Sequence, residues 1–138
     1  MRYAERYTDL AERGPDIRMT LARPESVATP VDAKRDRYDD VRAIVDTGAD
    51  ICVIRHAYAD DLGLQKHDER QFANSTGCEV RPVYRVDLIF KDGRRRPYET
   101  AGCDFRGQNI EFLLGRNFLA HVRFSYDGPL GGYELEFE

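Results

Sequence analysis

The sequence predicts a mostly β domain, and three observations support this fold class. The length of 138 residues fits one domain with one hydrophobic core. Apolar, β-branched and aromatic residues occur in short runs rather than in long helical periods. Six prolines and 11 glycines stand between those runs, as turn residues do between strands. We therefore expect a single, mostly β domain.

The expected elements are short and follow one another closely. Strands are predicted at residues 17–21, 41–45, 51–54, 83–90, 98–105, 110–114, 121–126 and 133–137. Turns are predicted at Asp92-Gly93, Arg106-Gly107 and Asp127-Gly128. Residues 57–64 indicate a short helical turn that ends at Gly63. Residues 24–40, with their prolines and charges, are expected to form an exposed loop.

The first 15 residues are charged, and two interpretations of them stay open. A frayed helix and a flexible arm are both compatible with their composition. We therefore divide the chain into an N-terminal arm at residues 1–15 and a folded domain at residues 16–138.

Composition argues against several kinds of partner. The formal net charge of -4, from 21 basic and 25 acidic residues, gives no electrostatic footprint for nucleic acid. No apolar run approaches the roughly 18 residues of a membrane span. The first residues also lack the apolar core of a signal peptide. We expect a soluble, cytoplasmic protein that binds neither nucleic acid nor membrane.

Cysteine and histidine usage gives no sign of a metal centre. Three cysteines, Cys52, Cys78 and Cys103, cannot all pair within one chain, which fits a reducing compartment. Neither they nor the three histidines show metal-ligand spacing. We therefore expect no metal and no organic cofactor.

The tetrapeptide Asp46-Thr47-Gly48-Ala49 is the first candidate site. It lies between two apolar runs, at residues 43–45 and 51–54. A carboxylate on a tight turn between buried strands is unfavourable unless a partner or a shifted pKa compensates for it, so Asp46 is a candidate catalytic acid. Gly48 lets the chain turn sharply and lets a substrate backbone approach. Asp-Thr-Gly can also be an ordinary polar turn.

A second motif makes the interpretation specific. Residues 112–119 run from an apolar strand through Gly115 into a short helix. Ala-Ile-Val-Asp-Thr-Gly-Ala-Asp at residues 43–50 and Leu-Leu-Gly-Arg-Asn-Phe-Leu at residues 113–119 together resemble the retropepsin family. These are the single-lobe aspartic peptidases of retroviruses and their bacterial relatives. The resemblance spans about residues 40–126 and implies a closed acid-protease barrel, with one lobe per chain and one short helix after Gly115.

The resemblance also implies an activity and an assembly. Aspartic endopeptidases activate water with two Asp side chains that share one proton, because like charges about 3 Å apart cannot both ionise. The chain holds one Asp-Thr-Gly, so the implied enzyme is a C2 homodimer with Asp46 from each copy. Its substrate would be a peptide or protein.

Two alternatives remain beside this enzyme. One is a catalytically silent module of the same fold that dimerises and binds an extended peptide by strand addition. The other is an unrelated β-barrel or sandwich domain in which the Asp46 motif is a chance turn. Loss of peptide cleavage in Asp46→Asn would separate the enzyme from the silent module.

The family pattern assigns roles to the residues that follow Asp46. Thr47 would reach across the dimer interface, while Gly48 and Asp50 would bind the substrate backbone. Ala49 stands where many two-lobed enzymes have a hydroxyl residue. Without that hydrogen-bond donor the pKa values of the dyad should be higher, which favours mildly acidic activity.

Two residues of the second motif are expected to brace this loop. Arg116 matches the family arginine that pairs with the acid after the alanine, which here is Asp50. Such a bidentate pair would hold the active-site loop against the helix, together with Asn117. The other interpretation of Arg116 is a surface arginine at a helix start.

The resemblance places a flap hairpin at residues 74–77. Ser75, Thr76 and Gly77 are the expected substrate-binding residues of this flap. Only Gly77 supplies a glycine near the tip, and the segment is more polar than the viral pattern, so an ordinary exposed loop is the alternative. Ile110, in the loop before the second motif, is expected to line a subsite, and the family default is an apolar cleavage preference.

Overall fold

A computed structural model describes residues 1–74 and 77–138. These residues form ten strands, three short α-helices and one 3-10 turn, η1, at Phe105–Gly107. The helices are α1 (Leu10–Arg13), α2 (His56–Asp61) and α3 (Arg116–Leu119). The strands are β1 (Arg2–Arg6), β2 (Asp16–Ala22), β3 (Arg37–Val45), β4 (Cys52–Arg55), β5 (Asp68–Asn74), β6 (Gly77–Ile89), β7 (Arg95–Cys103), β8 (Phe112–Leu114), β9 (Arg123–Asp127) and β10 (Gly132–Glu136).

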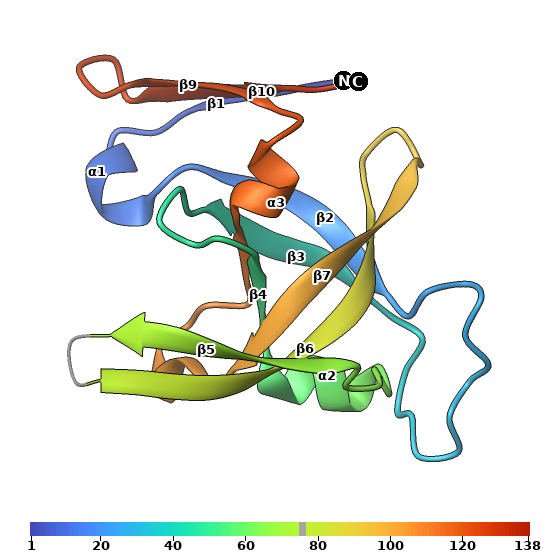
Figure 1. The fold of residues 1–138 in the computed structure, drawn as a ribbon. Helices are drawn as coiled ribbons and strands as arrows, with labels where there is room; N and C mark the ends of the chain where they lie inside the picture. The colour runs from blue at the N-terminus through green and yellow to red at the C-terminus, as the bar shows by residue number, and fades with distance from the viewer. Residues whose placement is uncertain (75–76) are drawn as a thin grey trace.

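The body of the molecule is a closed β-barrel. One sheet has the strand order β2-β3-β8-β4-β7-β6-β5, and β2 also pairs with β6, so the first six strands close on themselves. Closure removes the unpaired edges that an open sheet would expose. Strand β5 stays outside the ring and forms a long hairpin with β6 (Figure 1). The predicted mostly β barrel is therefore confirmed.

Parallel pairing brings the two sequence motifs to the same end of the barrel. Strand β8 runs parallel to β3, with Val45 opposite Leu114, and antiparallel to β4. Asp46 and Gly115 each follow directly on these paired strand ends. The amide of Asp46 donates to the carbonyl of Leu114 at 3.0 Å, which continues the pairing into the loop.

Apolar side chains from almost every barrel strand fill the interior. Leu21, Ile54, Leu88 and Phe112 are fully buried. Burying a side chain of this size contributes about 1.5–3 kcal/mol, so these positions account for much of the stability. All four residues belong to the apolar runs from which strands were predicted.

The N-terminal segment, undecided from sequence, is part of the folded body. Strand β1 pairs with β10, and β10 pairs with β9, which gives a separate three-stranded sheet. The two chain ends therefore lie side by side (Figure 1). The buried ring of Tyr3 stacks on Phe137 with centroids 6.0 Å apart. Helix α1 then leads into β2.

Several predicted boundaries need correction. Strands β1 and β5 and helix α1 were not predicted, because their sequences are largely polar. Strand β3 begins at Arg37 and not at residue 41, and β6 begins at Gly77 and not at residue 83. These extensions lie largely exposed, so they lack the apolar runs on which the predictions relied. Helix α2 and the turn at Asp92-Gly93 occur where they were expected.

A buried acid joins the barrel to the terminal sheet. The carboxylate of Asp16 accepts hydrogen bonds from Tyr133 Oη at 2.8 Å and Arg42 Nε at 2.5 Å. Burial would raise the pKa of Asp16, but the hydrogen bonds from Arg42 and Tyr133 and the charges of Arg42 and Arg13 outweigh it, so the pKa is lowered. The ionised acid therefore stabilises the folded state.

We expect Asp16→Ala to lower the free energy of unfolding by about 2–4 kcal/mol, because Arg42 and Tyr133 lose their buried acceptor. Urea denaturation at neutral pH measures this. The control is Asp39→Ala, which removes an exposed carboxylate from an ion pair with Arg37 and should leave the midpoint almost unchanged.

The same acid should make stability depend on pH. Because its folded pKa is lowered, its contribution is complete above the ordinary value of 3.8 and disappears as pH falls through the folded value. The difference in the free energy of unfolding between wild type and Asp16→Ala should become smaller as the pH is lowered. A difference that stays constant to the lowest measurable pH would contradict this account.

Candidate active site

The Asp46 loop is a tight turn between β3 and β4. The amide of Gly48 donates to Asp46 Oδ1 at 3.0 Å, and the amide of Ala49 donates to the Asp46 carbonyl at 3.2 Å. A Cβ on residue 48 would lie only 3.2 Å from Asp46 Oδ1, so glycine lets the turn fold around the acid. Asp46 remains half-buried, while Thr47 and Gly48 are exposed.

The turn that leads into α3 binds the Asp46 loop through hydrogen bonds. The amide of Arg116 donates to the Ala49 carbonyl at 2.8 Å, and the amide of Asn117 donates to the Asp50 carbonyl at 3.2 Å. The guanidinium of Arg116 donates to the Thr47 carbonyl at 2.7 Å. Loop carbonyls thus satisfy helix-end amides that have no partner within the helix.

The side chain of Asn117 ties three elements together. Its Oδ1 accepts from the amides of Cys52 at 2.9 Å and Phe118 at 3.0 Å, and its Nδ2 donates to the Glu99 carbonyl at 2.9 Å. The amide group therefore bridges β4, β7 and α3. Both its donor and its acceptor functions are needed, so no other side chain of this size could replace it.

Gly115 permits the close crossing of the two motifs. A Cβ on this residue would lie 2.3 Å from the carbonyl carbon and 2.4 Å from the oxygen of Ile51, and 2.8 Å from the amide of Cys52. These are backbone atoms, which cannot move aside as the end of a flexible side chain can. Any larger residue would force the Asp46 loop away from α3.

We expect Gly115→Ala to destabilise the fold by at least about 2–3 kcal/mol, because the methyl group clashes with backbone. The matched control is Gly128→Ala, where the added Cβ would make an ordinary 3.5 Å contact with the ring of Tyr126. Thermal unfolding of both variants measures the difference. Equal melting temperatures would show that the crossing is not a tight constraint.

The predicted ion pair between Asp50 and Arg116 is not the one observed. Asp50 Oδ2 lies 3.3 Å from Nη1 of Arg70, on β5, and Asp50 Oδ1 accepts from the amide of Ile51 at 3.0 Å. Arg116 instead reaches the nearer carbonyl of Thr47. Sequence analysis missed Arg70 because β5 was not predicted, and only the folded hairpin brings this strand beside the loop.

The β5–β6 hairpin stands where the flap was expected. Gly77 pairs with Asn74 at its end and adopts a φ of 130°, which favours glycine. Ser75 and Thr76 lie outside the described residues. Substrate closure by this hairpin stays a prediction.

The loop around Ile110 is fixed by an arginine that the sequence did not single out. Arg55 Nε donates to the Ile110 carbonyl at 2.9 Å, and its Nη2 donates to the Gln108 carbonyl at 2.6 Å. Ile110 itself is half-buried. Its role as a subsite wall stays a prediction.

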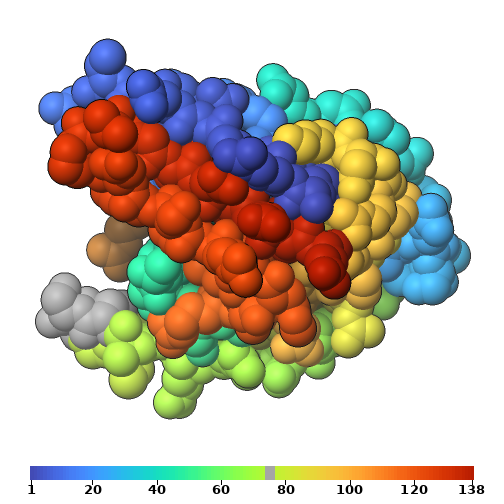
Figure 2. Space-filling model, turned by 90° about the horizontal axis from the view of Figure 1, so that it is seen from above, coloured from blue at the N-terminus to red at the C-terminus, as the bar shows by residue number. Residues whose placement is uncertain are grey.

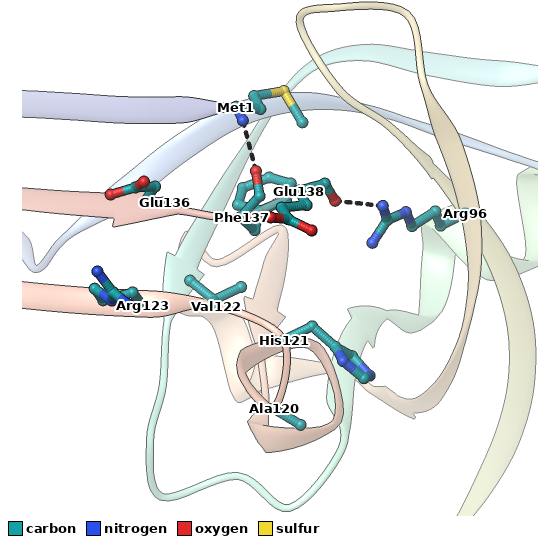
Figure 3. A pocket seen from close by; sticks show the side chains of 9 residues that line it. All are labelled: Met1, Arg96, Ala120, His121, Val122, Arg123, Glu136, Phe137 and Glu138. Atoms are coloured by element: carbon teal, nitrogen blue, oxygen red, sulfur yellow. Dashed lines mark hydrogen bonds between the residues drawn. The ribbon is translucent and has the colours of Figure 1, made fainter.

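An open cavity of about 660 Å³ lies elsewhere, beside the chain termini (Figure 3). None of its lining residues belongs to the Asp46 loop or the β5–β6 hairpin, so it is separate from the candidate active site. Its lining consists of Met1, Arg96, Ala120, His121, Val122, Arg123, Glu136, Phe137 and Glu138.

The described residues hold no group of three or more His, Cys, Asp or Glu side chains that could bind a metal ion. Burial raises the pKa of the Cys52 thiol to about 12, which keeps it protonated and unreactive at neutral pH. None of the described helices is long and apolar enough to cross a membrane.

The closed barrel, its Asp-Thr-Gly loop and the glycine turn that crosses this loop are features of a retropepsin-like fold, and the first of two structural matches supports this class. EIAV protease complexed with the inhibitor HBY-793 matches with a TM-score of 0.50 and 19% sequence identity, over 83% of this chain and 90% of that one. The Simian Foamy Virus (mac) protease, in a solution structure, gives a TM-score of 0.47 and 15% identity, over 75% and 92% of the two chains.

Sequence comparison gives the family. A model described as aspartyl protease matches residues 31–118, which is more than half of the chain and includes both motifs. A comparison with curated proteins gives no match. The chain belongs to the aspartyl protease family, and the predicted retropepsin-like identity is confirmed.

Proposed function

We propose that the chain is an aspartic endopeptidase whose Asp dyad is completed by a second copy of the chain. The observation that carries the proposal is the exposed loop with its single Asp46, which contacts within its own chain hold in place. The family match supports protease chemistry. One carboxylate cannot both take a proton from water and donate one to a carbonyl, so a second Asp46 is required.

The surface around the loop supports a homodimer with C2 symmetry. The β5–β6 and β9–β10 hairpins extend to the same side of the molecule as the Asp46 loop, which lies between them (Figures 1 and 2). Of five large apolar side chains that stand exposed among the described residues, three lie on these hairpins: Val80, Tyr126 and Leu130. Contact between two copies would bury such side chains and bring the Asp46 loops together.

In the proposed mechanism, the two Asp46 carboxyl groups share one proton and hold a water molecule between them. The ionised group removes a proton from the water molecule as the water oxygen attacks the scissile carbonyl carbon. The protonated group donates its proton to the carbonyl oxygen, which gives a neutral gem-diol. The pair titrates as a unit, so its two pKa values belong to the dyad.

Collapse of the gem-diol completes the reaction. One hydroxyl returns its proton to the ionised carboxylate as the carbonyl re-forms, and the carbon–nitrogen bond breaks. The departing nitrogen takes the proton of the other Asp46. The products are a carboxylic acid and an amine, and the dyad ends with one proton, as it began.

Peptide-library cleavage by wild type and Asp46→Asn, from about pH 3 to about pH 8, tests this proposal. We expect activity in wild type, strongest in mildly acidic solution, and none measurable in the variant. The control is Asp39→Asn, which alters an exposed carboxylate on β3, the strand that leads to Asp46, and should keep full activity. Rates at high dilution should rise faster than linearly with protein concentration, because the dimer is the active form.

A silent peptide-binding module would give a different result. The outer edge of β5 has no strand partner among the described residues, so it could accept an extended peptide by strand addition. Peptide binding of equal affinity in wild type and Asp46→Asn, with no cleavage by either, would favour this function over the enzyme.

The interface can be tested without activity. We expect Leu130→Glu to raise the dimer dissociation constant about tenfold or more, because each copy would place a charge where apolar surface is buried. Val31→Glu is the control, since Val31 is also an exposed apolar residue but lies in the loop between β2 and β3. Sedimentation measures both, and equal dissociation constants would place the dimer contact elsewhere.

A further inference from the structure

The β5–β6 hairpin is attached to the barrel at its base. Strand β5 pairs with β6 alone, so no second strand holds it. The ring of Phe72 packs against a small apolar cluster of Ile51, Val83 and Ala101. Phe72 lies opposite Glu79, toward the tip end of the hairpin, so this contact packs the outer half of β5 against the cluster that contains Ile51, the residue before β4.

One ion pair connects the hairpin with the loop itself. Arg70 Nη1 lies 3.3 Å from Asp50 Oδ2. The acid cannot move freely, because Asp50 Oδ1 accepts from the Ile51 amide and the Asp50 carbonyl accepts from the Asn117 amide. A carboxylate that the body of the molecule holds in place therefore presents its second oxygen to the hairpin.

The other ion pairs of β5, β6 and the residues just before them do not reach the Asp46 loop: His67 pairs with Glu99 and Asp87 with Arg95, both on β7, and the rest are local. Lys66 pairs with Glu69, just before and within β5. Arg81 pairs with Glu79 at 3.2 Å, within β6. Among the described residues, the pair of Arg70 with Asp50 is thus the one salt bridge between the hairpin and the segment from Asp46 to Asp50.

We propose that Arg70 is a positioning residue, which fixes the height of the β5–β6 hairpin over the Asp46 loop through its pair with Asp50. The inference rests on the proposed function and on the predicted role of this hairpin as a flap that closes on the peptide substrate. Losing the pair should loosen the hairpin and raise KM, while kcat changes little because Arg70 does not touch the reacting atoms.

Hydrogen exchange tests the positioning role without relying on activity. In Arg70→Ala, the amides of residues 68–74 and 77–83 should exchange about two- to fivefold faster, which matches the modest strength of an exposed ion pair. The matched control is Lys66→Ala, which removes the same charge beside the same strand but leaves the pair with Asp50 intact. Equal exchange in both variants would overturn the proposal.

A double-mutant cycle tests whether Arg70 acts through Asp50. In an Asp50→Asn background the carboxylate is gone, so Arg70→Ala should have no further effect on exchange. Additive effects would show that Arg70 acts elsewhere and would overturn the proposal. Wild-type exchange should also rise in about 1 M salt, where screening weakens the pair, and should not rise in Arg70→Ala.

Kinetics then separates this inference from the proposed function. With a cleaved peptide, KM should rise about two- to fivefold in Arg70→Ala and stay unchanged in Lys66→Ala. If wild type cleaves no peptide, the proposed function fails while hydrogen exchange still decides the role of Arg70. If wild type cleaves but Arg70→Ala changes neither exchange nor KM, the positioning role alone fails.

Discussion

The crossing of the Asp46 loop and the Gly115 turn is the constraint on which the rest of the structure depends. Parallel pairing of β3 with β8 brings the two segments to one end of the barrel, and the missing side chain of Gly115 lets the backbones touch. Backbone amides of Arg116 and Asn117 then hold the loop carbonyls. Asp46, the proposed catalytic acid, is thus positioned largely by main-chain hydrogen bonds between the two segments.

The sequence predicted the parts of this arrangement whose signals are local. Asp46 and Gly115 lie at the ends of apolar runs, so both turns were visible without a structure. Arg70 carried no such signal, because the sequence of β5 is largely polar. Arg70 comes to lie beside Asp50 only through the way the β5–β6 hairpin folds back. Arg116 was given the wrong partner for a different reason: the family pattern pairs this arginine with the acid after the alanine, Asp50, whereas its guanidinium donates to the Thr47 carbonyl.

The terminal sheet illustrates another limit of local reasoning. Residues 1–15 look like an arm because few of them are apolar, yet Tyr3 and Leu10 are buried. Strand β1 is ordered by pairing with β10, more than 120 residues away, and Asp16 connects that sheet to the barrel. Order in this segment comes from long-range pairing, which no local pattern reports.

The contacts that position Asp46 lie within one chain, and this has a consequence for assembly. The buried barrel core, the Asn117 bridges and the Gly115 crossing are all made within one chain, so we expect the chain to fold before the proposed dimer forms. In the proposed mechanism, association of two copies then adds the second Asp46 carboxylate to a loop whose conformation is already fixed by its own chain. On that mechanism a folded monomer would be inactive, and at a given pH the protein concentration would control activity through the dimer equilibrium.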